Sequence, residues 1–562
     1  MASVRDWCRS AVEALREDGA AGLADLVRTK CIGLRCRKTV LAMRRDRQEA
    51  DETWNRWVHD HPLSPETRRL QAHDQFPDTL SILVPTYNTN PSHLAALAES
   101  IAAQTCSRWE VCFYDGASTD VRTRSMLELL ARRDARFRVT FGKENLGISG
   151  NTNAALAMAT GTWVALCDHD DLLSPEAVWC ILRAAARGAE MVYTDEDKCS
   201  QDGTFFFDPH LKEDFAPDSL RSGNYICHLM AMPASLMRSL GGLRSVCDGS
   251  QDHDLALRAS EQVQHVQHIP RVLYHWRMLD SSYSHERAVL CVQAAARAVQ
   301  DQLDRLDLPG RVETFRRRIV VHYEPPKDAR VTLVVIGGGT ESWLQEVLQR
   351  AGYPVAEVIH ARVSQLDGET QRASGEYLVF LAEGVLPGRG WLTELLGYAR
   401  RRDVACTGGI LVDKHQCYLH CGYAWDPETG CIVPFHGQCR VGITSQLKDR
   451  GVRNVSGVSS ALMCVRREVF QRLGGFGPYL SDARGLSIGL RAIRAGFCNV
   501  ITPLAMASAP PAACLSPDSA RNEYTLLRQE FGVHDIEHYY PKTMDRRGAM
   551  IPDPGRLEEV GR

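Results

Sequence analysis

The chain has 562 residues, which is long enough for two to four domains of about 150 residues each. Its 66 basic and 69 acidic side chains give a formal net charge of −3 at pH 7, so the overall charge excludes a general preference for nucleic acid or other polyanions. No run approaches the roughly 18 consecutive apolar residues of a membrane-spanning helix, and the first residues do not resemble a secretory signal, which together predict a cytoplasmic protein.

Residues 1–78 are polar and have a helical pattern. Within them, residues 28–47 contain eight basic side chains against the single acid Asp46. Such a run can dock on anionic lipid at about 1 kcal/mol per basic residue near the surface. A solvated helix face explains the same pattern equally well, so peripheral contact with the inner membrane is one of two open interpretations.

From residue 80 onward, short apolar runs alternate with helical patterns. Residues 81–84 and 109–114 are typical of buried strands, and the pattern between them predicts a helix over 91–104. Strand–helix–strand units of this kind indicate a parallel sheet with helices on both faces. The sequence therefore predicts an α/β fold.

Part of this pattern occurs twice. Residues 240–243 (Leu-Gly-Gly-Leu) correspond to 473–476 (Leu-Gly-Gly-Phe), and at the same offset Pro270 corresponds to Pro503. Several matches in one register are hard to obtain by chance. We infer two related α/β domains, joined near residues 323–326, where two prolines interrupt the pattern.

Carboxylates cluster where one predicted strand ends. The apolar run 163–167 leads directly into residues 168–171, Asp-His-Asp-Asp. Ligands bind at the carboxyl ends of strands in open α/β sheets, and two acids separated by one residue can hold a hard divalent ion together with diphosphate oxygens. An acidic turn that caps the next helix, near residue 175, explains the same residues, and this motif alone does not decide between the two.

Three polar positions lie further along the chain. Asp252 and Asp254 stand at the start of a predicted helix over 255–261, where the helix N-terminus favours an ionised carboxylate and suits a cap or a general base. His275 lies near the end of a strand-like run over 268–277, a position where a histidine is more often structural than a metal ligand.

An ordered series of motifs extends from residue 83 to residue 277. The series comprises Leu83–Asn88, Asp115–Asp120, Asn145–Ser149, Asp168–Asp171, Tyr193–Lys198, Asn224–His228, Gly249–Asp254 and Tyr274–Arg277. In order and spacing it resembles the family 2 glycosyltransferases of the GT-A fold, in particular enzymes of bacterial O-antigen, capsule and rhamnan synthesis. Each motif alone is weak evidence, whereas the series is specific.

The resemblance implies that a nucleotide lies against the first two strand ends. Pro85, Thr86 and Tyr87 would contact the base, and Asp115 the base or the ribose. Many family members have a second acid after the equivalent of Asp115, which helps to read a uracil, but this chain has Gly116 there. The identity of the base therefore stays open.

The resemblance also implies a divalent cation, Mg²⁺ or Mn²⁺, because the motif is rich in oxygen ligands. Asp168 would lie near the ribose or the metal, Asp170 would bind the ion directly, and His275 would be a second protein ligand. Asp252 would accept the proton of the acceptor hydroxyl in an inverting displacement at the anomeric carbon.

The implied reaction moves a sugar, of hexosyl or rhamnosyl type, from a nucleotide-sugar donor to a growing surface polysaccharide or a lipid-linked glycan. Asp195, Asp197 and Asp254 would shape the acceptor side of the site. For Asp195 and Asp197, a solvated acidic loop is the open alternative, and for Asp254 it is a contact at the helix end.

The second domain lacks the functional groups that the first contains. On the two alignments, Asp168, Asp170, Asp252 and His275 correspond to Ala382, Gly384, Gly485 and Ser508. We therefore predict two GT-A-like domains of which only the first is catalytic: a helical region over 1–78, a catalytic domain over 79–322, a degenerate GT-A-like domain over 331–515 and a C-terminal tail over 516–562.

Cysteines and histidines gather in one segment of the second domain. They are His415, Cys417, His420, Cys421, Cys431, His436 and Cys439. Their spacing contains no Cys-x2-Cys pair, so ordinary buried thiols are favoured over a structural zinc site.

A non-catalytic carbohydrate-binding or scaffold subunit of a polysaccharide assembly complex is the alternative for the whole chain. The second domain already fits that description. The first domain argues against it, because a scaffold has no use for carboxylates at separate strand and helix ends.

Overall fold

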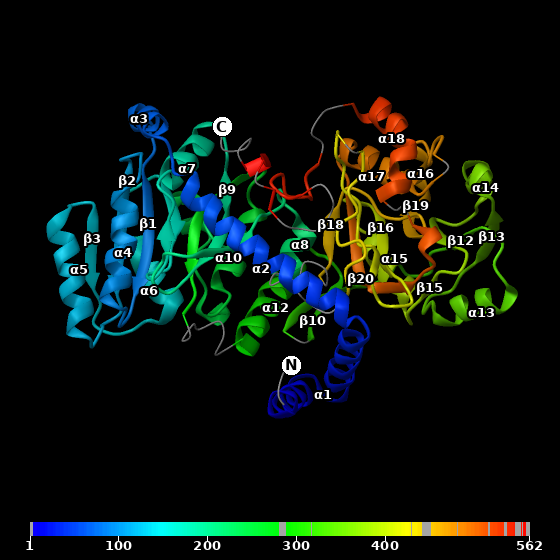
Figure 1. The fold of residues 1–562 in the computed structure, drawn as a ribbon, viewed down its shortest axis with the longest axis horizontal. Coiled ribbons are helices and arrows are strands. Elements are labelled where there is room, and N and C mark those ends of the chain that lie inside the picture. The colour runs from blue at the N-terminus through cyan, green and yellow to red at the C-terminus, as the bar shows by residue number, and fades with distance from the viewer. Residues whose placement is uncertain are drawn as a thin grey trace.

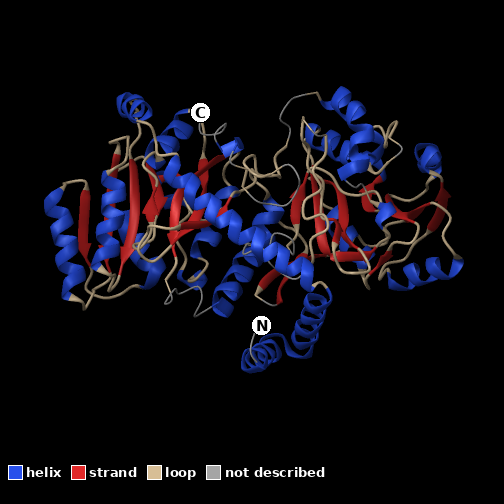
Figure 2. Cartoon of the chain, in the orientation of Figure 1, coloured by secondary structure: helices blue, strands red, loops and turns tan. Residues whose placement is uncertain are grey.

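The structure, a computed structural model, describes residues 4–279, 288–315, 317–428, 430–440, 451–479, 481–514, 517–532, 537–545, 552–553 and 555–557. Two mixed sheets lie side by side, each with helices packed on its faces, and a helical N-terminal arm crosses the middle of the molecule (Figures 1 and 2). This arrangement confirms the predicted fold class. No helix in the described part of the chain is long and apolar enough to span a membrane.

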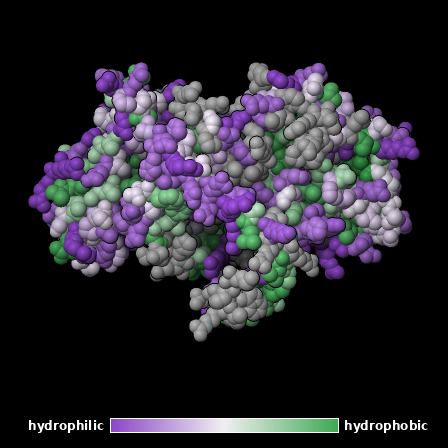
Figure 3. Space-filling model, viewed as in Figure 1, coloured by the Kyte–Doolittle hydropathy of each residue, from purple (hydrophilic) through white to green (hydrophobic). Residues whose placement is uncertain are grey.

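The N-terminal arm consists of three helices. They are α1 (Val4–Arg35), which is broken at Gly19, α2 (Arg37–Asp60) and α3 (Pro65–His73). The α2 helix packs on the first sheet: the Trp54 indole donates to Asp197 over 2.9 Å, and Arg47 forms an ion pair with Asp208. The face of the molecule that α2 crosses is mainly hydrophilic (Figure 3).

The first sheet has the order β3-β2-β1-β4-β8-β6-β9-β5, with β7 paired to β6. Its first four strands are parallel, and β8 and β5 are antiparallel to their neighbours. Every residue of β1 and β2 is buried except one in each strand, which explains their nearly continuous apolar sequence. The strands are β1 (Leu80–Thr86), β2 (Trp109–Asp115), β3 (Phe137–Phe141), β4 (Trp163–Leu166), β5 (Leu172–Leu173), β6 (Met191–Cys199), β7 (Phe206–His210), β8 (Met230–Pro233) and β9 (Val266–Arg277).

Helices connect these strands and cover both faces of the sheet. The first of them begins as the sequence predicts, because the Asn90 side chain accepts from the Ser92 backbone N–H and Pro91 occupies the first turn. The helices are α4 (Pro91–Ala102), α5 (Val121–Arg133), α6 (Gly147–Met158), α7 (Ala177–Ala186), α8 (Pro217–Ser222), α9 (Ala234–Ser239), α10 (Gln251–Ser260) and α12 (Ala288–Arg305).

The second sheet repeats the order of the first, and its described strands include no counterpart of β3. Its order is β13-β12-β14-β19-β16-β20-β15, with β17 paired to β16 and β18 to β20. The strands are β12 (Val331–Ile336), β13 (Glu357–Ala361), β14 (Tyr377–Ala382), β15 (Leu386–Pro387), β16 (Val404–Val412), β17 (Tyr418–His420), β18 (Arg453–Val455), β19 (Leu462–Arg466) and β20 (Cys498–Ser508). The helices are α13 (Glu341–Arg350), α14 (Leu366–Arg372), α15 (Trp391–Ala399), α16 (Arg467–Arg472), α17 (Ala483–Arg494) and α18 (Pro517–Phe531).

The side chains show the same repeat. Arg258 donates to the carbonyls of Leu240 and Gly242, and Arg491 donates to the carbonyls of the corresponding glycine-motif residues, Leu473 and Gly475. The strand register agrees, because Leu172 pairs with His275 in the first sheet and Leu386 pairs with Ser508 in the second. The two alignments drawn from the sequence therefore describe one structural correspondence.

The two halves contact each other directly. The hairpin of β10 (Gly310–Phe315) and β11 (Arg318–Tyr323) leads from the first half into the second. Beside it, buried Asp218 forms an ion pair with Arg401 and accepts from the Asn454 amide over 3.0 Å. These contacts place β18 of the second half next to α8 of the first half.

Candidate active site

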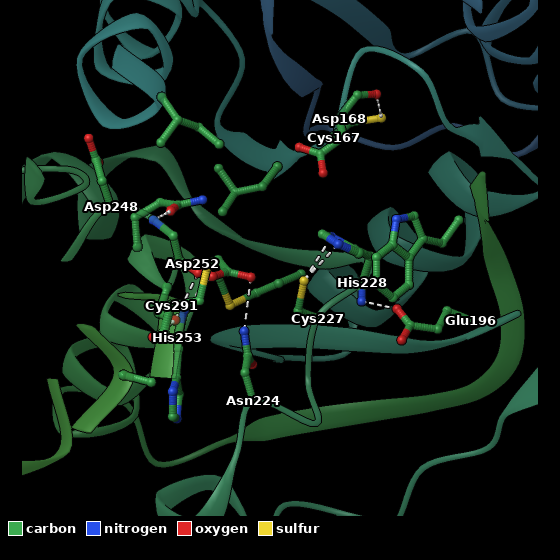
Figure 4. Close-up of a pocket in the computed structure, with 18 of the residues that line it drawn as sticks. Cys167, Asp168, Glu196, Asn224, Cys227, His228, Asp248, Asp252, His253 and Cys291 are labelled. Carbon is green, nitrogen blue, oxygen red and sulfur yellow. Dashed lines mark hydrogen bonds between the residues drawn. The ribbon is translucent and has the colours of Figure 1, made fainter. Parts of the chain in front are cut away.

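A cavity of about 1490 Å³ opens at the carboxyl ends of β1 and β4. Its walls also include the N-terminal end of α10 and the segment between α8 and β8 (Figure 4). Open α/β sheets bind ligands at this edge. Among the predicted site residues, the cavity brings together Pro85, Thr86, Tyr87, Asp168, Asp170, Asp197 and Asp252.

Asp168 and Asp170 lie on the turn that follows β4. Burial raises the pKa of Asp168 to about 6, and the neighbouring carboxylates of Asp170 and Asp252 act in the same direction. Asp170 is partly exposed, with 22% of its side chain accessible. Three carboxylates thus share one concave space, where a cation would offset their mutual repulsion.

A buried network holds this turn in place. Asp171 is fully buried and accepts from the Tyr274 hydroxyl and, over 2.7 Å, from the Arg277 backbone N–H. The Arg277 guanidinium donates to the Asp170 carbonyl over 2.5 Å. Asp171 therefore positions the turn, while the side chains of Asp168 and Asp170 line the cavity.

Asp252 lies in the first turn of α10. Its carboxylate accepts from the Asn224 amide over 2.9 Å (Figure 4). This position places the carboxylate in the cavity, within reach of a bound acceptor hydroxyl, as a general base requires. Asn224 belongs to one of the motifs in the sequence series, and the structure gives it a position: it orients Asp252.

The predicted nucleotide wall is present in part. Pro85, Thr86 and Tyr87 line the cavity, and Tyr87 is exposed. Asp115 does not line the cavity, because this residue is fully buried. Its carboxylate accepts from the Ser118 hydroxyl over 2.5 Å and from the Ser118 backbone N–H over 2.9 Å. A direct contact of Asp115 with a base or ribose is not supported by this arrangement.

His275 does not reach Asp170. Its Nδ1 lies 2.6 Å from Asp197 and its Nε2 lies 3.0 Å from the Ser174 hydroxyl, so both ring nitrogens are engaged, and the ring is not part of the cavity lining. The structure does not place His275 where a second metal ligand beside Asp170 would lie. Its ring lies between Ser174, which follows β5, and Asp197 of β6.

The expected acceptor-side acids have structural partners. Asp195 is buried against His268, and Asp197, although beside the cavity, accepts from His275 and Trp54. Asp254 is fully buried and forms ion pairs with Arg244 and Arg258. Asp195 and Asp254 are thus held by partners away from the cavity lining, whereas Asp197 lies at the cavity, and an acceptor-side role for these three residues stays a prediction.

The comparisons with known proteins agree with the geometry. The family model of glycosyl transferase family 2 matches residues 81–239, the segment that supplies most of the cavity. This segment is a family 2 glycosyltransferase domain.

Two relatives extend beyond the family 2 domain. The uncharacterized protein y4gI of Sinorhizobium fredii (strain NBRC 101917 / NGR234) is 30% identical over 88% of this chain and 60% of its own length. The O-antigen biosynthesis protein RfbC of Myxococcus xanthus is 28% identical over 71% of this chain and 34% of its own length. The chain thus spans between one third and three fifths of the length of these two relatives. Among solved structures, S. aureus TarS 1–349 in complex with UDP-GlcNAc is 17% identical, with a TM-score of 0.34 over 40% of this chain and 66% of that chain.

Segments outside the family 2 domain complete the cavity. Residues 317–319 of the β10–β11 hairpin and residues 451–453 at the start of β18 line it on one side. The sequence motifs do not indicate these segments, since their role depends on how the two halves pack. Glu196 and His228 also line the cavity, and only their presence in the motif series pointed to them.

We expect Asp254→Ala to lower the free energy of unfolding of the protein by about 3–5 kcal/mol, because it leaves two arginines near a buried site without their carboxylate. Urea denaturation measures the change. Asp60→Ala is the control, because Asp60 is exposed at the end of helix α2. It should change the free energy of unfolding by less than about 0.5 kcal/mol. Equal effects of both substitutions would contradict the assignment of Asp254 as a structural anchor.

The raised pKa of Asp168 predicts a pH-dependent contribution to stability in the absence of divalent cations. The protonated Asp168 carboxyl contributes this stability in full below the usual pKa of 3.8. The contribution is lost as the pH rises through a pKa of about 6, because the carboxyl then ionises in a buried site that disfavours its charge. Asp168→Asn should therefore raise the free energy of unfolding at pH 8 by at most about 3 kcal/mol and should change it little below pH 3.8. Chemical denaturation in EDTA at both pH values tests this; a lower stability of the variant at pH 8 would contradict it.

Proposed function

We propose that this protein transfers a sugar from a nucleotide-sugar donor to a growing surface polysaccharide or a lipid-linked glycan. The observation that carries the proposal is the cavity in the family 2 domain, where Asp168, Asp170 and Asp252 meet at the carboxyl edge of the sheet. The printed name of the relative RfbC, an O-antigen biosynthesis protein, supports a surface polysaccharide as the product class.

The nucleotide binds, in this proposal, against the wall formed by Pro85, Thr86 and Tyr87. Tyr87 is 45% exposed, so its ring is available to stack on a base. Asp115 supports the wall indirectly, since its neighbour Ser118 also accepts from the backbone N–H of Asn88 over 2.7 Å. Asp168 lies on the same side and faces the ribose and diphosphate.

The residues present fit a divalent cation, Mg²⁺ or Mn²⁺. Asp168 and Asp170 offer oxygen ligands on one turn, and burial together with nearby carboxylates raises the pKa of Asp168, which a bound cation would reverse. When bound, such an ion supplies positive charge that stabilises the departing diphosphate. His275 takes no part in holding it.

Asp252 acts as the general base. Its carboxylate, oriented by Asn224, accepts the proton of the acceptor hydroxyl while that oxygen attacks the anomeric carbon from the side opposite the diphosphate. One displacement of this kind inverts the configuration at the anomeric carbon.

The second sheet, in this proposal, has no catalytic site and serves acceptor binding or assembly. Gly485 stands where the first sheet has Asp252, and a Cβ atom there would lie 2.2 Å from the Val458 carbonyl oxygen, so no side chain fits. Nearby, Asp482 is saturated by the hydroxyls of Tyr423 and Ser459, each at 2.5 Å. The chain works at the inner face of the membrane, and the exposed basic residues of α1 and α2 would face anionic lipid there.

Binding of sugar nucleotides tests the proposal. Calorimetric titration of the full chain with a panel of uridine, guanosine, thymidine and cytidine diphosphate sugars, with and without Mn²⁺, should identify one donor whose affinity depends on the ion. Asp170→Asn should remove the dependence on the ion. Absence of binding for every donor would favour the alternative of a non-catalytic scaffold subunit.

A further inference from the structure

Three cysteines from distant parts of the sequence meet outside the cavity. Cys36 lies between α1 and α2, and Cys417 and Cys439 lie in the segment around β17 of the second half. Their Sγ atoms all lie within 4.8 Å of one another. Cys36 also donates a hydrogen bond to the His415 carbonyl over 3.3 Å, which supports its position beside the other two cysteines. Sequence spacing cannot indicate this cluster, because Cys36 is nearly four hundred residues away from them.

The spacing of the two nearest sulfurs of the cluster is compatible with a metal ion. The Sγ atoms of Cys417 and Cys439 are 3.6 Å apart. A disulfide requires about 2.05 Å, whereas two thiolates on a tetrahedral zinc ion with Zn–S bonds of about 2.3 Å lie about 3.8 Å apart. The observed separation thus matches two corners of a metal site.

The other cysteines of the same segment have different surroundings. Cys431 is buried and donates to the neighbouring carbonyl of Ile432, and the Cys421 sulfur accepts from Arg453 over 2.9 Å. Cys36 and Cys439 are buried at 8% and 2% exposure, while Cys417 keeps partial access to solvent. The cluster therefore has a protected interior and an open side through which an ion can enter.

We propose that Cys36, Cys417 and Cys439 bind a soft divalent cation, with Zn²⁺ as the expected ion. Thiolate sulfur selects thiophilic ions such as Zn²⁺ over the hard ions Mg²⁺ and Mn²⁺ that carboxylates favour. On binding, the three thiols form three metal–sulfur bonds and release their protons to solvent. The part of the chain that the structure describes offers three protein ligands here, so water would complete the fourth position.

Such an ion would fasten the N-terminal arm to the second half. At its other end the arm contacts the first half, through Trp54 with Asp197 and Arg47 with Asp208. Among the described residues, the apolar cluster around Cys36 contains Ile32, Val40 and Met43 beside the cysteines. The site therefore links the arm to the segment around β17 where apolar packing alone is small, and it does not depend on the proposed sugar transfer.

The test is the metal content of the full-length protein after purification from zinc-supplemented medium and removal of loosely bound ions. Elemental analysis should find about one Zn²⁺ per chain, and Cys36→Ser and Cys439→Ser should each lower it about tenfold or more. Cys31→Ser is the matched control, because Cys31 is exposed on α1, the helix that ends just before Cys36, and it should keep the wild-type content. Replacement of Zn²⁺ by Co²⁺ should give a thiolate-to-metal charge-transfer band that Cys36→Ser removes.

Hydrogen exchange distinguishes a bridging ion from a failure to fold. Chelation should speed amide exchange in residues 28–44 of the wild-type arm and leave the cores of both sheets protected. The proposal is overturned if Cys36→Ser, with both cores protected, keeps the wild-type zinc content, or if the purified protein contains a Cys417–Cys439 disulfide. Zinc that is retained while the arm exchanges at the same rate with and without chelator would also overturn the bridge.

Discussion

Asp252→Asn should lower the rate of sugar transfer by about 10²–10⁴-fold while it changes donor affinity little. Asn keeps the size of the side chain and a hydrogen-bonding partner for Asn224, but it cannot accept the acceptor proton. Steady-state kinetics with the donor identified by calorimetry measure the rate, and titration of the same variant measures donor affinity. The loss should therefore appear in kcat rather than in donor binding.

Glu383→Gln is the matched control in the second half. Glu383 lies in the turn after β14, between the counterparts of Asp168 and Asp170. Among the contacts of the described residues, its exposed carboxylate accepts only from backbone N–H groups, such as that of Gly338 at 3.0 Å. This variant should keep the wild-type rate. Loss of transfer in Glu383→Gln, together with activity in Asp252→Asn, would place the working site in the second half and contradict the proposal.

Asp170→Asn should lower transfer by about 10²–10³-fold and should weaken Mn²⁺ binding, because removal of one carboxylate takes away a negatively charged ligand of the cation. Unlike Asp252→Asn, it should also reduce donor affinity in the presence of Mn²⁺, since the ion contacts the diphosphate. Electron paramagnetic resonance of free Mn²⁺ reports the metal affinity, and kinetics at several Mn²⁺ concentrations report the rate.

Asp202→Asn controls for a general loss of negative charge near the cavity. Asp202 lies in the exposed turn between β6 and β7, where its carboxylate accepts from Ser200 and Thr204. Transfer and Mn²⁺ binding should be unchanged in this variant. If Asp170→Asn binds Mn²⁺ as tightly as Asp202→Asn does, the metal is held elsewhere or is not required.

The fold was predictable because its signals are local. Strands β1, β2 and β4 are buried over most of their length, so their apolar runs and the intervening helical patterns identify them directly. The repeat was also detectable, because the glycine motifs and the arginines that cap them recur at one offset in both halves.

The active-site carboxylates were predictable to the extent that they terminate elements. Asp168, Asp170 and Asp252 follow a strand or begin a helix, and such positions converge at one edge of an α/β sheet. His275 and Asp254 occupy similar positions in the sequence, yet their side chains face partners inside the protein. Side-chain direction in these places depends on strand register and on distant arginines, which no local pattern reveals.

Contacts between the halves were not predictable at all. The sequence gives no sign that residues 451–453 would line the cavity or that Cys36 would lie beside Cys417 and Cys439. Each depends on the packing of segments that are separated by hundreds of residues. Motif spacing, which favoured ordinary buried thiols over a zinc site in residues 415–439, detects only ligands that are close in the sequence.

The central claim is that the cavity of the first half turns over a nucleotide sugar with a divalent cation. The most direct measurement is donor turnover, both transfer and hydrolysis, over a panel of sugar nucleotides with Mn²⁺ or Mg²⁺, in the wild type, Asp170→Ala and Asp252→Asn. We predict cation-dependent turnover of one donor that both substitutions abolish. Turnover that survives both substitutions, or no turnover and no nucleotide binding by the wild type, would contradict the claim.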